Sequence, residues 1–116
     1  MSIAFARWTA DDVLAALSRA GVRINHAEPA RWPPRAPQPT THREAFTVYS
    51  AEAIDPHLVL TFNAPEALEV WRLWLARYWK ARPYLSVKDN VLLLVSRDVP
   101  PGRAAVFHAA LERLGA

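Results

Sequence analysis

The sequence predicts an α+β fold: an antiparallel sheet of four to five strands with three amphipathic helices packed on one face of it. Two observations indicate this fold. Segments in which apolar and polar residues alternate follow one another in pairs, at residues 44–62 and 84–96. Three further segments, 9–21, 63–80 and 100–115, have a helical spacing of apolar residues between capping and stop signals. The predicted order of elements is α-(β)-β-β-α-β-β-α.

The composition is that of one folded domain. The chain has 116 residues, of which 52% are hydrophobic and 22% charged, as in globular rather than disordered proteins. We therefore treat residues 1–116 as a single α+β domain that contains a proline-rich arm at residues 29–39. The absence of cysteine excludes disulfides, thiolate metal sites and cysteine nucleophiles. Residues 1–8 lack the pattern of a signal peptide and no apolar run is long enough to cross a membrane, so we expect a cytoplasmic protein.

The first helix is predicted from its two ends. Thr9 is a good N-cap residue, and Asp12 three positions later completes a capping-box pattern. Gly21 is expected to end the helix, with Val22 packing back on it in a Schellman motif. The alternation that follows predicts a short strand over residues 22–25.

The proline-rich arm holds five of the ten prolines, together with Trp32. Because proline lacks an amide hydrogen and fixes φ, this arm is not expected to form a helix or a central strand. It is either a surface strap that holds Trp32 against the core or an exposed proline–aromatic segment that binds a partner.

The second helix carries many of the aromatic side chains expected in the core. Asn63 is its predicted N-cap, Pro65 lies in its first turn, and Pro83 is expected to stop it. Leu73 falls among charged positions on the opposite face, as a lone exposed apolar residue. The apolar arc comprises Ala64, Ala67, Leu68, Trp71, Trp74, Leu75, Tyr78 and Trp79.

The last third of the chain predicts a tight hairpin followed by a helix. Asp89 and Asn90 separate β-rich runs at residues 84–88 and 91–96, and both residue types tolerate positive φ. Positions 91–95 are all apolar, which indicates a strand that is central or covered on both faces. The helix that follows is bounded by Pro100 and Gly115 and has a buried stripe of Phe107, Ala110, Leu111 and Leu114.

No motif predicts catalysis, a metal site or a cofactor. None of the serines lies in a GxSxG pattern, and no cluster of serine, histidine and aspartate follows from the spacing. The few glycines form neither a GxGxxG motif nor a P-loop. The histidines, His26, His42, His57 and His108, lack metal-ligand spacing. We expect His57 and His108 to be surface or edge residues with satisfied hydrogen bonds.

A basic and aromatic segment at residues 71–88 makes nucleic acid one alternative partner. The net charge is +3, and this segment interleaves cations with tryptophan and tyrosine, which together can hold single-stranded nucleic acid. On a helical wheel, however, most of these aromatic residues point inward and the cations outward. The candidate contacts to nucleic acid are Arg72, Arg77, Lys80, Arg82 and Lys88.

Self-association is the other interpretation of the aromatic content. Five tryptophans are many for a chain of this length, and exposed apolar patches often mark an interface. The candidate interaction residues are Trp32, Val70, Leu73 and Trp74.

Three segments resemble a family of small, uncharacterised bacterial α+β domains. They are the strand and capped helix at residues 60–68, the hairpin at 84–95, and the helix start at 99–105 that leads to Ala110 and Leu111. Residues 9–21 are also similar to the opening helix of that family. The resemblance implies no catalytic residues. Members often carry a secretion or lipoprotein signal, a pattern that we do not expect from residues 1–8, and they tend to have a glycine where this chain has Asp89.

The order of elements also resembles that of type III secretion chaperones, which are dimeric binding proteins. Many of those chaperones are acidic, whereas this chain is basic. We therefore predict a non-enzymatic binding or protein-interaction module, expected to be a homodimer. The alternatives are a nucleic-acid-binding protein that uses residues 71–88 and an enzyme subunit without a recognisable motif. No membrane partner is expected.

Overall fold

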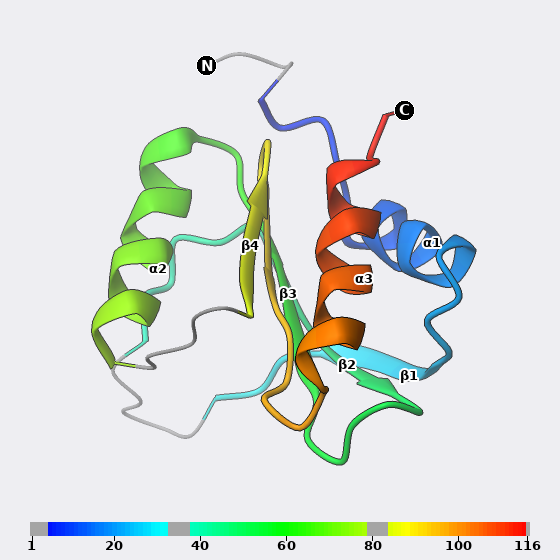
Figure 1. Ribbon diagram of the computed structural model, residues 1–116. Helices are drawn as coiled ribbons and strands as arrows, with labels where there is room; N and C mark the ends of the chain where they lie inside the picture. The colour runs from blue at the N-terminus through cyan, green and yellow to red at the C-terminus, as the bar shows by residue number, and fades with distance from the viewer. Residues whose placement is uncertain (1–4, 33–37, 79–83, 116) are drawn as a thin grey trace.

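The computed structural model describes residues 5–32, 38–78 and 84–115. Five antiparallel strands form one sheet in the order β1-β2-β3-β5-β4 (Figure 1). This confirms the α+β class and the predicted order of elements. The elements are α1 (Ala10–Arg19), β1 (Ile24–Pro29), β2 (Glu44–Ser50), β3 (His57–Thr61), α2 (Pro65–Tyr78), β4 (Leu85–Lys88), β5 (Val91–Leu94) and α3 (Pro101–Glu112).

The three helices cover both faces of the sheet. Side chains alternate along β5, so Leu93 faces the core shared with α1 and α3, whereas Leu92 faces the core shared with α2. The prediction that the helices lie on one face is therefore wrong, because α2 lies opposite α1 and α3 (Figure 1). The physical reason is β5 itself: a strand that is apolar on both faces needs a layer on each side. Each layer also leaves one side of its helices facing solvent.

The ends of α1 form as its sequence predicts. The hydroxyl oxygen of Thr9 accepts the N–H of Asp12 at 3.3 Å, and the Asp12 carboxylate accepts the N–H of Thr9 at 2.8 Å. At the other end Gly21 has a φ of 93°, and the N–H of Val22 donates to the carbonyl of Leu17 at 3.0 Å. The two hydrogen bonds between Thr9 and Asp12 form a capping box. The positive φ of Gly21 and the hydrogen bond from Val22 form a Schellman motif.

The strand predicted at residues 22–25 begins later and runs further. Val22 belongs to the helix stop and is buried there, while β1 spans Ile24–Pro29 and enters the proline-rich arm. Its register with β2 shifts between Ile24 and His26, so the alternation seen before this irregularity does not continue through the strand. Since β1 is an edge strand, the proline at its end costs no ladder hydrogen bond.

The hairpin and the last helix match their predictions with one difference. A two-residue turn joins β4 and β5, but only Asp89 has a positive φ, of 51°. Asn90 is fully buried and uses its side chain to bond other segments. In the last helix the predicted stripe is buried, and Gly115 after it has a φ of 83°.

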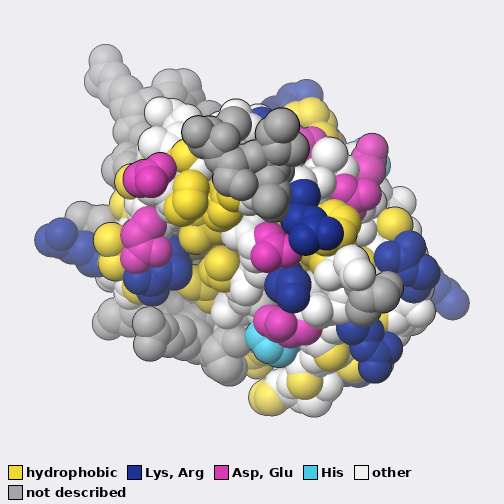
Figure 2. Space-filling model, turned by 90° about the horizontal axis from the view of Figure 1, so that it is seen from above, with side chains coloured by type: hydrophobic (Ala, Val, Ile, Leu, Met, Phe, Trp, Pro, Cys, Tyr) yellow, Lys and Arg dark blue, Asp and Glu magenta, His cyan; other side chains and the backbone are white. Residues whose placement is uncertain are grey.

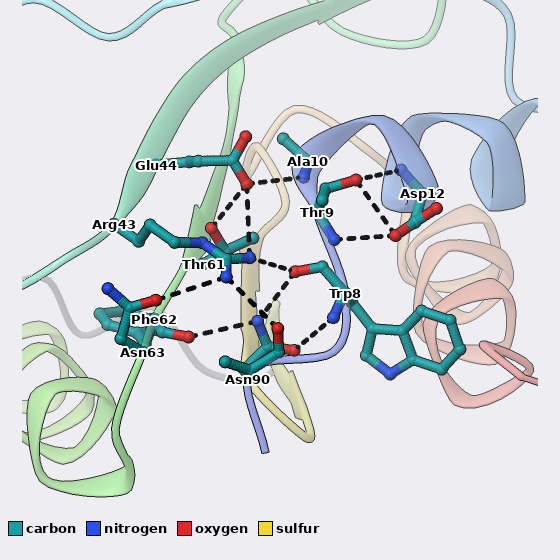
Figure 3. A network of polar contacts seen from close by, with 11 residues as sticks. Trp8, Thr9, Ala10, Asp12, Arg43, Glu44, Thr61, Phe62, Asn63 and Asn90 are labelled. Atoms are coloured by element: carbon teal, nitrogen blue, oxygen red, sulfur yellow. Dashed lines mark hydrogen bonds and ion pairs between the residues drawn. The ribbon is translucent and has the colours of Figure 1, made fainter. Parts of the chain in front are cut away.

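A polar network ties the segment before α1 to the sheet (Figure 3). The side chain of Asn90 accepts the N–H of Trp8 at 3.0 Å and donates to its carbonyl at 2.8 Å. A guanidinium nitrogen of Arg43 donates to the same carbonyl at 2.6 Å. The Glu44 carboxylate accepts the N–H of Ala10, in the first turn of α1, at 3.0 Å.

Within the described ranges, no helix is long and apolar enough to span a membrane.

Candidate interaction surface

Helix α2 has one face in the core and one in solvent. Leu68, Trp71 and Leu75 are buried and pack with apolar residues of β3 and β5. Their spacing of three to four residues places them on one side of the helix, as the helical wheel predicts. The described part of α2 ends at Tyr78, so Trp79 and Lys80 of the predicted helix lie outside the described residues.

An apolar stripe with charged ends runs along the exposed side of α2. It consists of Glu66, Val70, Leu73 and Arg77, whose spacing of four, three and four residues aligns them along the helix. Val70 is 45% exposed and Leu73 is 55% exposed. Leu73 is therefore not the lone exposed apolar residue of this face, because Val70 lies one turn before it. We call this row the α2 stripe.

A shallow hollow lies at the N-terminal half of the α2 stripe, lined by Pro65, Glu66, Glu69, Val70 and Leu73. The last four have the i, i+3, i+4, i+7 spacing of the side chains that receive one knob from a neighbouring helix. Figure 2 shows acidic, basic and hydrophobic side chains close together on the side of the molecule where α2 lies.

One ion pair lies beside the stripe. The Nε and Nη2 atoms of Arg72 each donate to one carboxylate oxygen of Glu69, three residues earlier. The hydrogen bond from Arg72 lowers the pKa of the Glu69 carboxyl below its ordinary value. This bidentate pair compensates the charge of Arg72 within α2 itself.

The remaining interaction candidates form an aromatic cluster around Trp71. The rings of Trp32 and Trp74 each lie 5.7 Å from the ring of Trp71, centroid to centroid. His42 contacts Trp71 at the same distance, and burial lowers the pKa of His42. Trp32 is 36% exposed, so it packs against the core with one edge in solvent. The contact of Trp32 with Trp71 fits the strap alternative at this residue, and residues 33–37 of the arm lie outside the described residues.

Of the candidate contacts to nucleic acid, the structure describes Arg72, Arg77 and Lys88. Trp71 is 1% exposed and cannot stack on a base. Arg72 is paired with Glu69, Arg77 lies in the last turn of α2, and Lys88 is half-buried at the end of β4. Lys80 and Arg82 lie outside the described residues.

The sheet and its loops bring one serine close to His57, a pair that the sequence spacing did not reveal. His57 is buried rather than a surface or edge residue, and its Nδ1 accepts the backbone N–H of Ser96 at 2.9 Å. The neutral ring therefore carries its proton on Nε2, which donates to the hydroxyl oxygen of Ser50 at 2.8 Å. A histidine that donates to the serine cannot remove the serine proton, so this pair does not generate a nucleophile.

A second serine–histidine pair links β4 to α3. Nδ1 of His108 lies 2.9 Å from the hydroxyl oxygen of Ser86, and its Nε2 lies 3.9 Å from a carboxylate oxygen of Glu112. The order serine, histidine, carboxylate is that of a hydrolase triad. Ser86 is 5% exposed, however, so its hydroxyl does not face a substrate in solvent. Only the packing of α3 on β4 brings the two residues together, which is why spacing gave no signal.

The described residues contain no group of three or more His, Asp or Glu side chains that could hold a metal ion.

No family model, curated protein or solved structure matches the chain.

Proposed function

We propose that this protein is a non-enzymatic interaction module that associates with itself through the α2 stripe. The single observation that carries the proposal is the adjacent exposure of Val70 and Leu73, at 45% and 55%, on the outer side of a helix whose inner side is buried in the core. Burying two neighbouring aliphatic side chains removes apolar surface from water, which is the main driving force of association.

The expected association is weak. Helix α2 has 14 residues and is about 21 Å long. One helix pair of this length buries an area at the small end of specific interfaces, which corresponds to transient rather than obligate dimers. Trp32 packs on Trp71 of α2 and is 36% exposed, so it adds apolar surface beside the helix.

Sedimentation equilibrium of the purified protein, from about 10 µM to about 1 mM, tests the proposal in the range where such interfaces associate. We expect a monomer–dimer equilibrium that the variant Leu73→Gln weakens by about tenfold, because it places a polar amide in the contact. Ile54→Gln is the matched control: it replaces an aliphatic residue that is 91% exposed in the loop between β2 and β3, and should leave the equilibrium unchanged.

Two results would contradict the proposal. One is a wild-type protein that remains monomeric over the whole concentration range. The other is an association that Leu73→Gln leaves intact. Association that appears only with added single-stranded oligonucleotide and disappears with salt would favour the nucleic-acid alternative instead.

A further inference from the structure

We infer, on the basis of the self-association proposed above, that two copies pair through α2 in antiparallel fashion, around a twofold axis that passes between Val70 and Leu73. The inference names the second copy of the chain as the occupant of the α2 stripe and specifies which residues face each other. Charge and shape each support it.

The charges of the stripe are self-complementary about its centre. Glu66 and Arg77 lie at equal distances from the midpoint between Val70 and Leu73, in opposite directions along the helix. In an antiparallel pair with its axis at that midpoint, Val70 faces Leu73 of the second copy, and Glu66 faces Arg77 of the second copy. Both ends of the contact then carry an ion pair.

Other arrangements of the same helix lack this match. In a parallel pair, each residue of the stripe faces its own copy, so Glu66 would face Glu66 and Arg77 would face Arg77. Like charges placed directly opposite each other disfavour that arrangement. The charge pattern therefore selects the antiparallel direction as well as the register.

The shape of the surface selects the same register. Besides Pro65, the hollow is lined by Glu66, Glu69, Val70 and Leu73, and the midpoint of these four helix positions lies between Glu69 and Val70. In the antiparallel pair, this midpoint lies opposite the point between Leu73 and Trp74 on the helix of the second copy. Leu73 is the more exposed of the two aliphatic residues of the α2 stripe, 55% against 45% for Val70, so it is the side chain available to enter the hollow as a knob. By symmetry each copy both provides and receives one leucine.

The bidentate pair of Glu69 and Arg72 supports this geometry. It holds the Glu69 carboxylate along its own helix, at the edge of the hollow that receives the leucine. Of the two glutamates that line the hollow, Glu69 is therefore already paired within each copy.

A charge exchange tests the register directly. The single variants Glu66→Lys and Arg77→Glu each replace both ion pairs of the dimer by like-charge contacts. We expect each to weaken self-association by about tenfold or more, since each loses two attractive contacts and gains two repulsive ones. In an equimolar mixture, the new lysine of one variant faces the new glutamate of the other. The mixture should then form a heterodimer about as tightly as the wild type associates.

Control variants separate this effect from a change in net charge. Asp55→Lys and Arg113→Glu make the same charge changes at exposed positions outside α2 and should alter neither self-association nor mixing. Thermal melts of every variant check that the folded state persists, and heterodimer formation in the mixture shows independently that both variants are folded.

The outcomes distinguish this inference from the proposed function. If the wild type associates and Leu73→Gln weakens it, but the mixture stays as weak as the separate variants, the surface is right and the antiparallel register is wrong. Single variants that associate like the wild type also overturn the register. If the wild type does not associate at all, both proposals fail.

Discussion

Nδ1 of His57 accepts the backbone N–H of Ser96 at 2.9 Å and thereby joins the start of β3 to the residues that follow β5. His57 is 1% exposed and its other ring nitrogen bonds Ser50 at 2.8 Å, so both nitrogens of the neutral ring are used. Protonation of Nδ1 would replace an acceptor by a donor that points at another donor. The folded protein therefore holds this histidine in its neutral form.

This contact predicts that the protein loses stability in mild acid. Burial lowers the pKa of His57, although Glu52 and Asp98 act in the opposite direction, and burial also lowers the pKa of His42. The unfolded chain therefore binds more protons than the folded chain as the pH falls through about 6.5. The free energy of unfolding should be constant above that pH. Below it, the free energy should fall by at most about 1.4 kcal/mol per pH unit for each histidine, until the folded pKa is passed.

Urea denaturation between about pH 8 and about pH 5.5, above the ordinary range of carboxyl groups, measures this slope. The variant His57→Gln should flatten the slope, whatever its effect on stability at neutral pH. A slope that is the same in His57→Gln and in the wild type would show that His57 does not titrate as the structure predicts.

Asn90 should be the polar residue whose loss costs most. Its side chain accepts the N–H of Trp8 and donates to the carbonyls of Trp8 and Phe62, all from a fully buried position. Asn90→Ala removes the partner of the Trp8 N–H and of the Phe62 carbonyl, whereas Arg43 still bonds the Trp8 carbonyl, and we expect it to lower the free energy of unfolding by about 2 to 4 kcal/mol. Chemical denaturation measures the loss, and limited proteolysis should show earlier cleavage before α1. The turn neighbour Asp89→Asn keeps an acceptor and tolerates positive φ, so it should change stability by less than about 0.5 kcal/mol.

Two glycines should respond in opposite directions to the same substitution. Gly115 has a φ of 83°, and a Cβ there would lie 3.0 Å from the indole ring of Trp8, so Gly115→Ala should destabilise the protein by about 1 to 2 kcal/mol. Gly102 lies in α3 and a Cβ there meets no atom within 4 Å, so Gly102→Ala should stabilise by about 0.5 kcal/mol through its helix propensity. Thermal melts of the two variants side by side provide the comparison. Equal shifts for both would contradict the role assigned to the left-handed conformation at Gly115.

Features that depend on neighbours in the sequence could be predicted before the structure. The capping box of Thr9, the stop at Gly21 and the turn at Asp89 each arise from contacts within a few residues. The periodicity of α2 likewise separates a buried side with Trp71 from an exposed side with Leu73. Local hydrogen bonding and helical geometry are enough to determine these features.

Features that depend on tertiary packing could not be predicted from the sequence. The pairs His57 with Ser50 and His108 with Ser86 join residues whose spacing in the chain carries no signal. The exposed fractions of Val70 and Leu73, 45% and 55%, likewise depend on where the layer beneath α2 ends, which a helical wheel does not show.

The sequence by itself determined the class of the fold, the order of its elements and the apolar nature of both faces of β5, because these follow from periodicity and from local capping and turn chemistry. Only the tertiary structure decided which helix covers which face. The sheet cannot leave Leu92 or Leu94 in water, so α2 crosses to the side away from α1 and α3. With one side of α2 occupied by that core, Val70 and Leu73 are left at the surface with a glutamate before them and an arginine after them.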